Sequence, residues 1–590
     1  MNILGLQLGH DGSACIIKDG QISSAIATER LTKVKKDRGV TPEVLDYILN
    51  DSDMCLEDVD LVALCNWFWD EDLEGNELFD KSKCQMKLFP RGGHEEISKS
   101  EYIKLCGDPN FFATDSLEIE IFGTRKRCLL VRHHLAHCSY SFFTSPCKRA
   151  ISFSFDYADN VSESSSAYLF DLKDGKLHFS KLQNFSNFWL GSYYGQICDY
   201  LGFYPSLDGA GKVMALAQKG EVDKEKACRI TYSELSKKAF GITDPFALTL
   251  ILNGVTDIPH NRVFYPQLKG EGGKVDPKWR NASQWNTNTS KNIAATAQYV
   301  LEKSISQFIQ DSNFLGKDWG ICLSGGVALN CVSNDNLLAW TDKTIHISPA
   351  CGDDGLSIGA ALFAHNITIP AENRDPKPEY SVSEVSFTGR NYDYGGSWVL
   401  SALNDNFEKV EWVEATNMDV AELLADGSTV ARFSGSSEFG PRALGNRSIL
   451  ANPKISGIRD KLNSKVKFRE EFRPYGVSVL HENAHEVFTT IGQESPYMLF
   501  ATYNKLHEEY EEVCCKRKTR IQTVRREDNE SFHELISEFN NLTGVPMLLN
   551  TSFNVQGQPI VETPEDAIES FLAMDLDYLY IGGFLVEKIK

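Results

Sequence analysis

The order of hydrophobic and polar residues at the start of the chain predicts three strands. Residues 2–9 form an apolar run that ends in the turn His10-Asp11-Gly12-Ser13, and a second apolar run covers residues 14–17. Asp19-Gly20 follows, which is a strong signal for a two-residue hairpin, and a third strand comes after it. The chain is therefore expected to open with a strand, an acidic turn and a hairpin.

The same pattern recurs about 150 residues later. Residues 150–155 alternate as a strand that ends at Asp156, and residues 167–172 and 177–182 predict two more strands joined by Asp174-Gly175. Two such copies predict a duplicated α/β domain whose halves face each other across a cleft, as in the actin and sugar-kinase class of folds.

An acid at the end of the first strand of each half would point into that cleft, where metal and phosphate chemistry is done. Asp11 and Asp156 hold these two positions. Taken singly, each is explained equally well as an aspartate that caps a turn. Their equivalent places in the two halves favour the functional interpretation.

A group of three histidines follows an apolar strand that is predicted over residues 128–131. A helix through Thr144 is expected there. On that helix His133 and His137 are four residues apart, so both imidazoles project from one face, close enough to share a cation. A histidine pair on a helix is as often a solvated or hydrogen-bonded face. The metal-site interpretation therefore requires carboxylates from elsewhere in the chain.

Asp156 and Asp353 are the candidates for these carboxylates. Asp353 stands on a turn before a helix of small residues over 358–364. A set of two histidines and two aspartates suits iron, manganese or zinc. Metal-dependent proteolysis is not favoured, because the stretch between His133 and His137 lacks the glutamate that serves as general base.

A glycine-rich turn follows another predicted strand, over residues 319–323. The turn is Ser324-Gly325-Gly326-Val327-Ala328-Leu329-Asn330, and it opens a helix. Paired glycines let the backbone approach a nucleotide closely, and a helix amino terminus favours its phosphate. A plain tight turn explains the two glycines at least as well. Residues 209–213 also resemble a phosphate loop, but Val213 stands where a magnesium-binding hydroxyl should be.

Length and composition indicate what kind of protein carries these motifs. A chain of 590 residues with 42% hydrophobic and 24% charged residues is expected to form two or three globular domains. The sequence contains no apolar run that would span a bilayer and no signal peptide, so a cytoplasmic protein without membrane contact is expected. Scattered cysteines indicate reduced thiols. The Pro-rich and polar segment 366–382 is interpreted as an interdomain linker.

The charge is unevenly distributed. A net charge of -21 argues against broad nucleic-acid binding, yet residues 442–473 contain nine basic and three acidic side chains, a local charge of +6. Such a concentration suggests phosphate binding, although a solvated charged face is the alternative. Glycine, proline and alanine stand close to Arg442 on both sides, which suits a tight binding turn better than an exposed helix. Downstream, a strand over 547–549 ends in Asn550-Thr551-Ser552-Phe553-Asn554, whose side chains can hydrogen-bond phosphate or carbamoyl oxygens.

Taken together, these segments resemble the O-carbamoyltransferases, which include tobramycin carbamoyltransferase and the enzymes that modify nodulation factors, cephamycins and ansamycins. The resemblance covers nearly the whole chain. It rests on Gly9-His10-Asp11-Gly12-Ser13-Ala14, His133 with His137, the strand ending at Asp156, Gly325-Gly326-Val327-Ala328-Leu329-Asn330-Cys331, Gly352-Asp353, Phe439-Gly440-Pro441-Arg442-Ala443-Leu444-Gly445-Asn446-Arg447-Ser448 and Asn550-Thr551-Ser552-Phe553-Asn554.

The resemblance implies an α/β protein with a duplicated actin-like, TsaD-like carbamoyl-transfer domain over 1–365, the linker 366–382, and a YrdC-like carbamoyl-adenylate-forming α/β domain over 383–590. The second domain would activate carbamoyl phosphate with ATP and Mg to carbamoyl adenylate. The first would transfer the carbamoyl group to a hydroxyl of a small-molecule acceptor, expected to be a secondary metabolite, and release AMP. No nucleic-acid partner is implied, and a homodimer stays open.

The resemblance also implies roles for individual residues. His10 would accept the proton of the acceptor hydroxyl, and Asp11 would orient His10 or hold the substrate. The implied ligands of a metal, with iron or another divalent or trivalent ion expected, are His133, His137, Asp156 and Asp353. The implied adenylate-binding turn contains Gly325, Gly326 and Asn330, and the implied carbamoyl-phosphate and ATP pocket contains Arg442, Lys467, Arg473, Arg520, Ser552 and Asn554.

The acceptor is not readable from the sequence. The turn Tyr157-Ala158-Asp159-Asn160 stands where relatives carry glycines and a glutamate, and segments 67–121 and 184–258 are expected to shape the acceptor pocket. Two other functions stay open: a fusion enzyme for tRNA threonylcarbamoyl transfer, and a non-catalytic regulator that binds nucleotide or metal. The net charge of -21 weighs against the first, and intact motifs in both halves weigh against the second.

Overall fold

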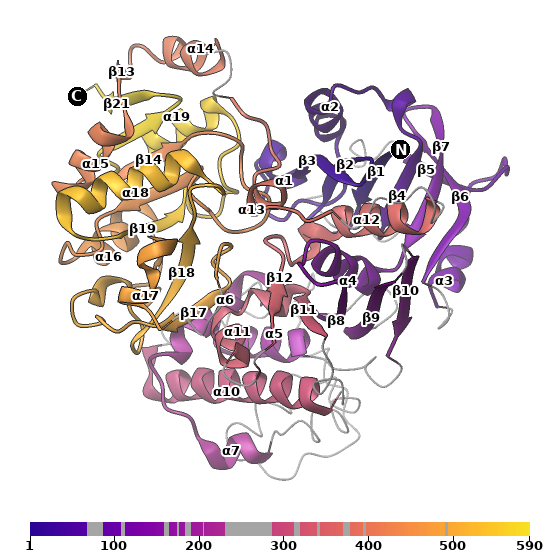
Figure 1. Ribbon diagram of the computed structural model, residues 1–590, viewed down its shortest axis with the longest axis horizontal. Helices are drawn as coiled ribbons and strands as arrows, with labels where there is room; N and C mark the ends of the chain where they lie inside the picture. The colour runs from indigo at the N-terminus through magenta and orange to yellow at the C-terminus, as the bar shows by residue number, and fades with distance from the viewer. Residues whose placement is uncertain are drawn as a thin grey trace, which may run out of the picture.

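The computed structural model describes residues 1–67, 86–107, 112–157, 164–173, 176–182, 190–203, 206–229, 286–311, 319–338, 341, 343–369, 378–392, 397–489 and 494–589. In this part of the chain the strands assemble into three β-sheets that helices cover (Figure 1). The predicted α/β class is therefore confirmed. In the two segments expected to shape the acceptor pocket, residues 68–85, 108–111, 184–189, 204–205 and 230–258 lie outside the described residues.

The first sheet has seven strands in the order β3-β2-β1-β4-β7-β6-β5. The strands are β1 (Asn2–Gln7), β2 (Ser13–Lys18), β3 (Gln21–Ala27), β4 (Leu61–Cys65), β5 (Met86–Pro90), β6 (Ala113–Ile121) and β7 (Thr124–Val131). β1 is antiparallel to β2 and parallel to β4. Asp19 and Gly20 have φ angles of 48° and 85°, the left-handed values that a tight two-residue hairpin requires.

The second sheet repeats this topology in the order β10-β9-β8-β11-β12. Its strands are β8 (Arg149–Phe155), β9 (Ser165–Lys173), β10 (Lys176–Lys181), β11 (Gly320–Ser324) and β12 (Ile345–Ile347). β8 is antiparallel to β9 and parallel to β11, as β1 is to β2 and β4. The predicted duplication is thus confirmed by strand order and direction, whereas the turn Asp174-Gly175 lies outside the described residues.

Two helices pack against each other between these sheets, α4 (His133–Phe143) and α12 (Leu356–Thr368) (Figure 1). α4 contacts β8, β9 and β11, and α12 contacts β1, β2 and β4. Gly359 allows this packing, because a Cβ atom there would lie 2.0 Å from the carbonyl oxygen of Ala136. The tight contact fixes α4, which carries the histidine pair, against α12 and the turn that precedes it.

Further helices complete the first two-thirds of the chain. They are α1 (Thr28–Thr32), α2 (Pro42–Asp51), α3 (Lys99–Gly107), α5 (Leu190–Tyr200), α6 (Ser206–Ala217), α7 (Lys224–Arg229), α10 (Asn288–Asp311) and α11 (Cys331–Leu338). Residues 209–213 lie within α6, so they do not form a phosphate loop. The segment interpreted as a linker begins in the last turn of α12, its residues 370–377 lie outside the described residues, and the domain boundaries stay a prediction.

The third sheet has nine strands in the order β13-β21-β20-β14-β15-β19-β16-β18-β17. They are β13 (Val410–Glu414), β14 (Val430–Phe433), β15 (Arg447–Ala451), β16 (Gly476–Leu480), β17 (Phe500–Tyr503), β18 (Lys518–Val524), β19 (Met547–Ser552), β20 (Tyr578–Ile581) and β21 (Phe584–Lys588). The helices around it are α13 (Val382–Ser386), α14 (Ser397–Asp405), α15 (Asn417–Ala425), α16 (Ile458–Lys461), α17 (Ala484–Val487), α18 (Glu530–Thr543) and α19 (Pro564–Ala573).

The third sheet is packed tightly against the second one. Its edge strand β17 contacts α11, and Leu499 and Phe500 are buried in the same apolar core as Phe155 and Ile321 of the second sheet. Asn334 on α11 donates to the carbonyl oxygen of Leu499 at 2.9 Å. Burial of this apolar surface fixes the carboxy-terminal sheet beside the strand and turn that precede α11.

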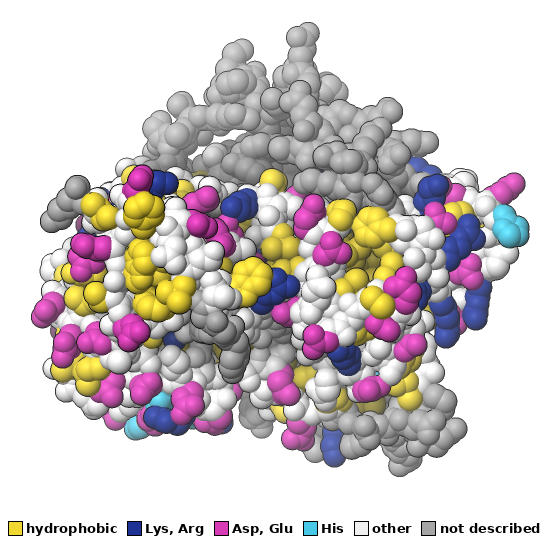
Figure 2. Space-filling model, turned by 90° about the horizontal axis from the view of Figure 1, so that it is seen from above, with side chains coloured by type: hydrophobic (Ala, Val, Ile, Leu, Met, Phe, Trp, Pro, Cys, Tyr) yellow, Lys and Arg dark blue, Asp and Glu magenta, His cyan; other side chains and the backbone are white. Residues whose placement is uncertain are grey.

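The surface carries both signs of charge. Figure 2 shows acidic side chains spread over the visible face, and basic side chains gathered at the right-hand edge, the end of the molecule where Figure 1 places β5 to β7. Among the described residues, no helix combines the length and the apolar character that a membrane crossing needs.

Candidate active site

The four predicted metal ligands meet at one point. His133 and His137 lie on α4, Asp156 follows the end of β8, and Asp353 lies on the turn before α12. One ligand atom from each of the four side chains lies within 4.8 Å of the others. His137 Nε2 is 2.9 Å from Asp156 Oδ2 and 3.2 Å from Asp353 Oδ1. Residues more than 200 positions apart therefore form one compact donor set.

The chemistry of this set fits a bound cation. His133 Nε2 is buried and has no hydrogen-bond partner among the described residues, and it lies 3.6 Å from Asp156 and 3.8 Å from Asp353. Its other ring nitrogen contacts the Asn66 amide at 3.2 Å, which fixes the plane of the ring. A buried donor set of two imidazoles and two carboxylates with one nitrogen unsatisfied among the described residues suits a transition metal.

The histidines and aspartates of this donor set shift one another's pKa values. Burial opposes the charged form of His137, but hydrogen bonds to Asp156 and Asp353 prevail and raise its pKa to about 9. Burial likewise opposes ionisation of Asp156, but His133 and His137 outweigh it and hold the pKa of this carboxyl well below its usual range. The Asp156 carboxylate is therefore charged, and it attracts positive charge.

His10 and Asp11, the predicted catalytic pair, lie at the rim of this donor set. His10 Nδ1 is 2.9 Å from Asp11 Oδ2, and His10 Nε2 is 3.3 Å from Asp353 Oδ2. The negative charge of Asp353 is the main reason that the pKa of His10 is raised to about 9. Positive charge held by the carboxylates would cancel this effect and lower the pKa. With 38% of its side chain exposed, His10 is accessible to a substrate.

The predicted adenylate turn adjoins the metal ligands. It follows β11 and forms the 3₁₀-helix η6 (Gly326–Leu329) rather than opening directly into the longer helix α11. Gly325 has φ 82°, and a Cβ atom there would lie 2.2 Å from the carbonyl oxygen of Phe155. A Cβ atom on Gly326 would lie 3.2 Å from Asp156 Oδ1. The two glycines thus bring the turn into contact with β8 and with Asp156, a predicted metal ligand.

Gly325→Ala is expected to lower the free energy of unfolding by at least about 1–3 kcal/mol, because a side chain is strained in this backbone region and would also clash with Phe155. The displaced turn should bind an ATP analogue more weakly. Thermal melting and calorimetric titration measure the two effects. Gly123→Ala is the matched control, since Gly123 also has φ 82° but has open space around it. Equal behaviour of both variants would show that strain alone matters at Gly325.

The side chain of Asn330 is engaged within the protein. It exchanges two hydrogen bonds of 3.0 Å with Gln298 and accepts another, of 3.1 Å, from the backbone of Ser333. Asn330 therefore braces the start of α11. A direct contact between its side chain and a nucleotide stays a prediction.

The predicted carbamoyl-phosphate pocket is a cluster of cations. Burial, together with the charges of Arg442, Arg469 and Arg473, lowers the pKa of Arg520 to about 9. Burial and the charge of Arg469 lower the pKa of Arg473 to about 10. Arg442 Nε and Arg520 Nε are buried and have no hydrogen-bond partner in the described structure. Mutually repelling guanidinium groups with unsatisfied donors suit an anion, and a carbamoyl-phosphate pocket here stays a prediction.

Lys467, Ser552 and Asn554 form one hydrogen-bonded group at this pocket. Lys467 Nζ donates to the carbonyl oxygen of Ser552 at 2.6 Å and to Asn554 Oδ1 at 2.8 Å. Burial and the charges of Arg469 and Arg473 hold the pKa of Lys467 well below its usual range. The structure therefore brings the predicted polar residues after β19 to the basic segment that precedes β16.

The two halves of the site touch each other. Arg442 Nη2 donates to the carbonyl oxygen of Leu329 in the glycine turn at 3.3 Å. A Cβ atom on Gly211 of α6 would lie 3.8 Å from Arg473 Nη2. The cation cluster of the third sheet and the metal-ligand set of the first two sheets are thus connected by the glycine turn.

Several residues at this junction were not predicted from the sequence. Arg469 belongs to the cation cluster, and Glu438 accepts hydrogen bonds from the backbone N–H groups of Leu444, Asn446 and Arg447, at and just after the end of the loop that carries Arg442. Arg469 was counted within the basic segment, but nothing in that segment distinguishes it from its exposed neighbours. Glu438 directly precedes the motif that begins at Phe439, and this position was its only signal.

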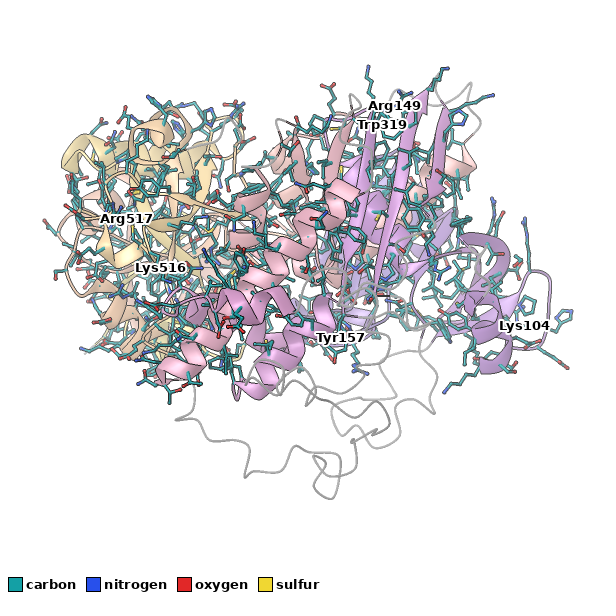
Figure 3. All side chains as sticks on the ribbon, turned by 90° about the horizontal axis from the view of Figure 1, so that it is seen from below. Lys104, Arg149, Tyr157, Trp319, Lys516 and Arg517 are labelled. Carbon is teal, nitrogen blue, oxygen red and sulfur yellow. The ribbon has the colours of Figure 1, made fainter. Side chains whose placement is uncertain are left out.

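Tyr157 lies beside the metal ligands. It follows Asp156 directly and is 43% exposed, and its carbonyl oxygen accepts a hydrogen bond of 2.8 Å from Ser192. Figure 3 shows Tyr157 at the opposite end of the second sheet from Arg149 and Trp319, which form a cation–π contact with 5.4 Å from the guanidinium carbon to the ring. Tyr157 is therefore placed at the functional edge of that sheet.

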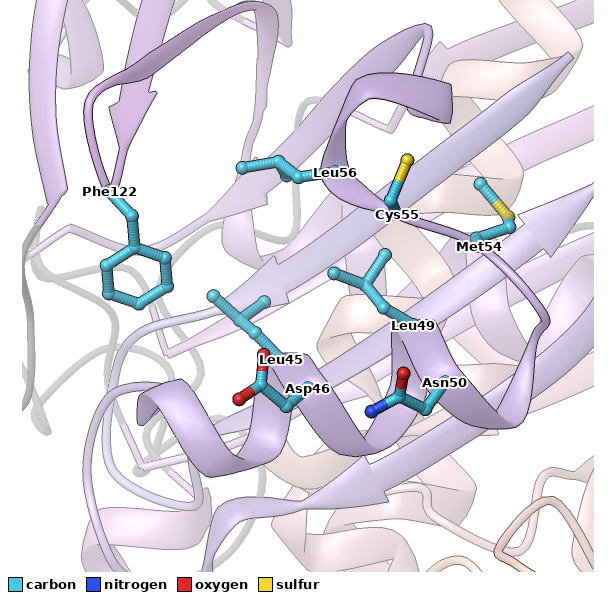
Figure 4. A pocket seen from close by; sticks show the side chains of 8 residues that line it. All are labelled: Leu45, Asp46, Leu49, Asn50, Met54, Cys55, Leu56 and Phe122. Atoms are coloured by element: carbon cyan, nitrogen blue, oxygen red, sulfur yellow. The ribbon is translucent and has the colours of Figure 1, made fainter.

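A shallow pocket lies elsewhere on the surface (Figure 4). Residues of α2 and of the chain after it line this pocket together with Phe122, and the pocket has a volume of about 230 Å³. It contains none of the predicted site residues, so it does not belong to the site described above.

Comparisons with known proteins identify the family. Residues 2–362 match the protein family described as "Carbamoyltransferase N-terminus". Residues 421–588 match the family described as "Carbamoyltransferase C-terminus". An uncharacterized protein of Synechocystis is 31% identical over 100% of this chain and 97% of its own length. The nodulation protein NolNO of Sinorhizobium fredii is 29% identical over 98% of this chain and 79% of its own length.

Solved structures add little to this result. Component A of the (R)-2-hydroxyglutaryl-CoA dehydratase of Acidaminococcus fermentans is 13% identical and covers 62% of this chain and 98% of its own, with a TM-score of 0.32. No argument follows from so low a score. The two matched families span most of the chain, and the predicted family is confirmed: this chain belongs to the carbamoyltransferase family.

Proposed function

We propose that the protein is an ATP-dependent O-carbamoyltransferase that activates carbamoyl phosphate as carbamoyl adenylate and transfers the carbamoyl group to a hydroxyl of a small-molecule acceptor. The observation that carries this proposal is the cluster of Arg442, Arg473 and Arg520. Arg442 contacts the glycine turn through Nη2, and the Nε atoms of Arg442 and Arg520 are buried without a partner among the described residues. A site for several phosphate groups is what two phosphorylated substrates need.

The activation of carbamoyl phosphate takes two steps in this proposal, a hydrolysis and an adenylation. Water releases phosphate from carbamoyl phosphate and leaves carbamate, whose oxygen attacks the α-phosphorus of ATP and displaces pyrophosphate. In this proposal Arg442, Arg473 and Arg520 neutralise the phosphate oxygens. Lys467 donates hydrogen bonds to oxygens of Ser552 and Asn554, and these two side chains line the carbamoyl position. Magnesium accompanies ATP as part of the substrate.

The transfer uses the other half of the site. The acceptor hydroxyl attacks the carbamoyl carbon, AMP leaves, and His10 takes the hydroxyl proton while Asp11 orients the imidazole ring through the contact of 2.9 Å. His133, His137, Asp156 and Asp353 would hold a metal, with iron as the proposed ion. When bound, such an ion supplies Lewis acidity toward a carbonyl or phosphoryl oxygen.

Product analysis tests the proposal. With ATP, carbamoyl phosphate and a panel of hydroxylated metabolites, the protein should form AMP and pyrophosphate only when carbamoyl phosphate is present. An O-carbamoylated product should accumulate with the correct acceptor. Modification of tRNA in the presence of threonine and bicarbonate would replace this proposal with threonylcarbamoyl transfer. Absence of both activities from a metal-loaded protein that binds ATP would indicate a regulator.

His10→Asn should separate the two steps. Pyrophosphate formation should stay near the wild-type rate, because His10 lies outside the cation cluster. Transfer should fall by about 10²- to 10⁴-fold, the usual contribution of a general base. Asparagine keeps the size and polarity of the side chain but cannot accept a proton at neutral pH, so single-turnover transfer measures the difference directly.

His178→Asn is the control, because His178 lies on β10 and does not belong to the donor set. This variant should keep both steps. Full transfer activity in His10→Asn would refute the role of general base, and loss of pyrophosphate formation in that variant would show that the two steps are not divided as proposed.

A further inference from the structure

The loop that carries Arg442, residues 438–445, is fixed at its base by the carboxy-terminal part of the protein. We call these residues the Arg442 loop. Glu438 Oε1 accepts hydrogen bonds from the backbone N–H groups of Leu444, Asn446 and Arg447 at 2.8, 2.8 and 3.1 Å. Gln522 Nε2 donates to the carbonyl oxygen of Leu444 at 2.8 Å. These bonds close the loop but do not reach its tip.

The tip of the Arg442 loop contacts the amino-terminal part instead. Phe439 is 3% exposed and belongs to the apolar core formed around α4 and α12. Gly440 has φ 111°, and a Cβ atom there would lie 2.8 Å from the carbonyl oxygen of Pro349, four residues before Asp353. The tip is therefore packed against the segment that leads to a metal ligand.

Arg30 of α1 makes two polar contacts at this tip, in addition to the bond of 2.7 Å that the Phe439 N–H donates to the carbonyl oxygen of Ser386. Its side chain is almost fully buried, with 4% exposure. Arg30 Nη2 donates to the carbonyl oxygens of Glu438 at 3.1 Å and Gly440 at 2.9 Å. These two carbonyl groups flank Phe439 and lie shortly before Arg442, so one guanidinium nitrogen fixes the backbone from which Arg442 projects.

We propose that Arg30 is a positioning residue for the activation step: it holds the Arg442 loop so that Arg442 reaches both the cation cluster and the glycine turn. Charged hydrogen bonds to backbone carbonyls are strong, and the planar guanidinium group loses little freedom in forming them. Arg30 belongs to the part of the chain proposed to transfer the carbamoyl group, yet its loss should impair the activation proposed for the other part. The inference rests on the proposed function.

Kinetics of pyrophosphate formation test this role. In Arg30→Met the KM for carbamoyl phosphate should rise about tenfold or more, the effect of losing one hydrogen bond of a charged group, whereas the KM for ATP should change much less. Arg30→Lys keeps a cation and should recover part of the loss. Arg127→Met is the control: Arg127 of β7 pairs with Asp115 of the neighbouring strand β6, away from the loop. Equal KM values in Arg30→Met and wild type would overturn the proposal.

A double-mutant cycle distinguishes positioning from general stability. If Arg30 acts through Arg442, Arg30→Met should add little loss in an Arg442→Lys background, because residues in one network are not additive. Multiplied losses would show that Arg30 does not act through Arg442 and would overturn the proposal.

Hydrogen exchange gives a readout that needs no turnover. Backbone amides of residues 436–446 should exchange at least several-fold faster in Arg30→Met than in wild type or Arg127→Met, at temperatures where all three are folded. Unchanged exchange would refute the restraint. A wild-type protein that forms no pyrophosphate would refute the proposed function, and the exchange experiment would still decide whether Arg30 holds the Arg442 loop.

Discussion

Arg442→Ala is expected to abolish carbamoyl-phosphate-dependent pyrophosphate formation, with kcat/KM lowered by about 10²- to 10³-fold or more, as for the loss of a preorganised donor to a developing charge. The physical reason is specific. Arg442 Nε is buried, with no partner in the residues that the structure describes, and Nη2 contacts Leu329 of the glycine turn at 3.3 Å. Removal of this side chain takes away both a phosphate ligand and the contact between the two halves of the site.

Lys465→Ala is the matched control for Arg442→Ala. Lys465 belongs to the same basic segment, but 62% of its side chain is exposed and it lies 4.0 Å from Asp575. A surface ion pair of this kind contributes little to stability, so activity should be unchanged. If both variants lose activity equally, the segment acts through its total charge. If Arg442→Ala still activates carbamoyl phosphate, the assignment of the pocket is wrong.

Arg442→Ala should nevertheless transfer the carbamoyl group from chemically prepared carbamoyl adenylate, because His10 and the four-residue donor set remain intact. Mixing the variant with the intermediate and the acceptor measures this step alone. Failure of transfer would mean that the cation cluster serves both steps.

His133→Ala is expected to lower metal affinity by at least about 10²-fold, the upper end of what loss of an outer-shell partner costs. His133 is the informative ligand, because its Nε2 has no hydrogen-bond partner in the described part of the chain, and alanine breaks no such bond there. Metal content after loading with Fe²⁺, Mn²⁺ or Zn²⁺ measures the affinity and also identifies the preferred ion. Transfer should fail in the variant, whereas pyrophosphate formation should persist.

His134→Gln controls for changes to the same helix. His134 lies next to His133 on α4, but its Nδ1 contacts Ser154 Oγ at 2.8 Å and the residue does not belong to the donor set. The control should lose some stability and keep its metal. Retention of a full equivalent of metal by His133→Ala would contradict the assigned ligand set.

Local patterns in the sequence were sufficient to predict much of the amino-terminal fold. Asp19-Gly20 predicted a hairpin because few residues adopt left-handed φ angles, and both residues have them. The repeated strand, acidic turn and hairpin predicted the duplication, which strand order confirms. The spacing of His133 and His137 placed both rings on one face of a helix, since helical geometry alone determines this relation.

Other features had no local signal. Asn330 belongs to the motif of the glycine turn, yet its side chain is occupied by Gln298, a residue 32 positions away on α10. Arg30 is one arginine among many in the sequence, and its partners lie 408 and 410 positions away. Contacts of this kind depend on how helices and sheets pack, so neither periodicity nor composition predicts them.

The sequence by itself determined the α/β class, the duplication within the amino-terminal part and the residue types that could bind a metal, because backbone conformation and helical spacing are local properties. The tertiary structure alone decided that Asp156 and Asp353 approach His137 within 2.9 and 3.2 Å. It also decided that Arg442 reaches the glycine turn of the other half. These proximities arise from burial of apolar surface between the sheets, which brings distant segments together whatever their order along the chain.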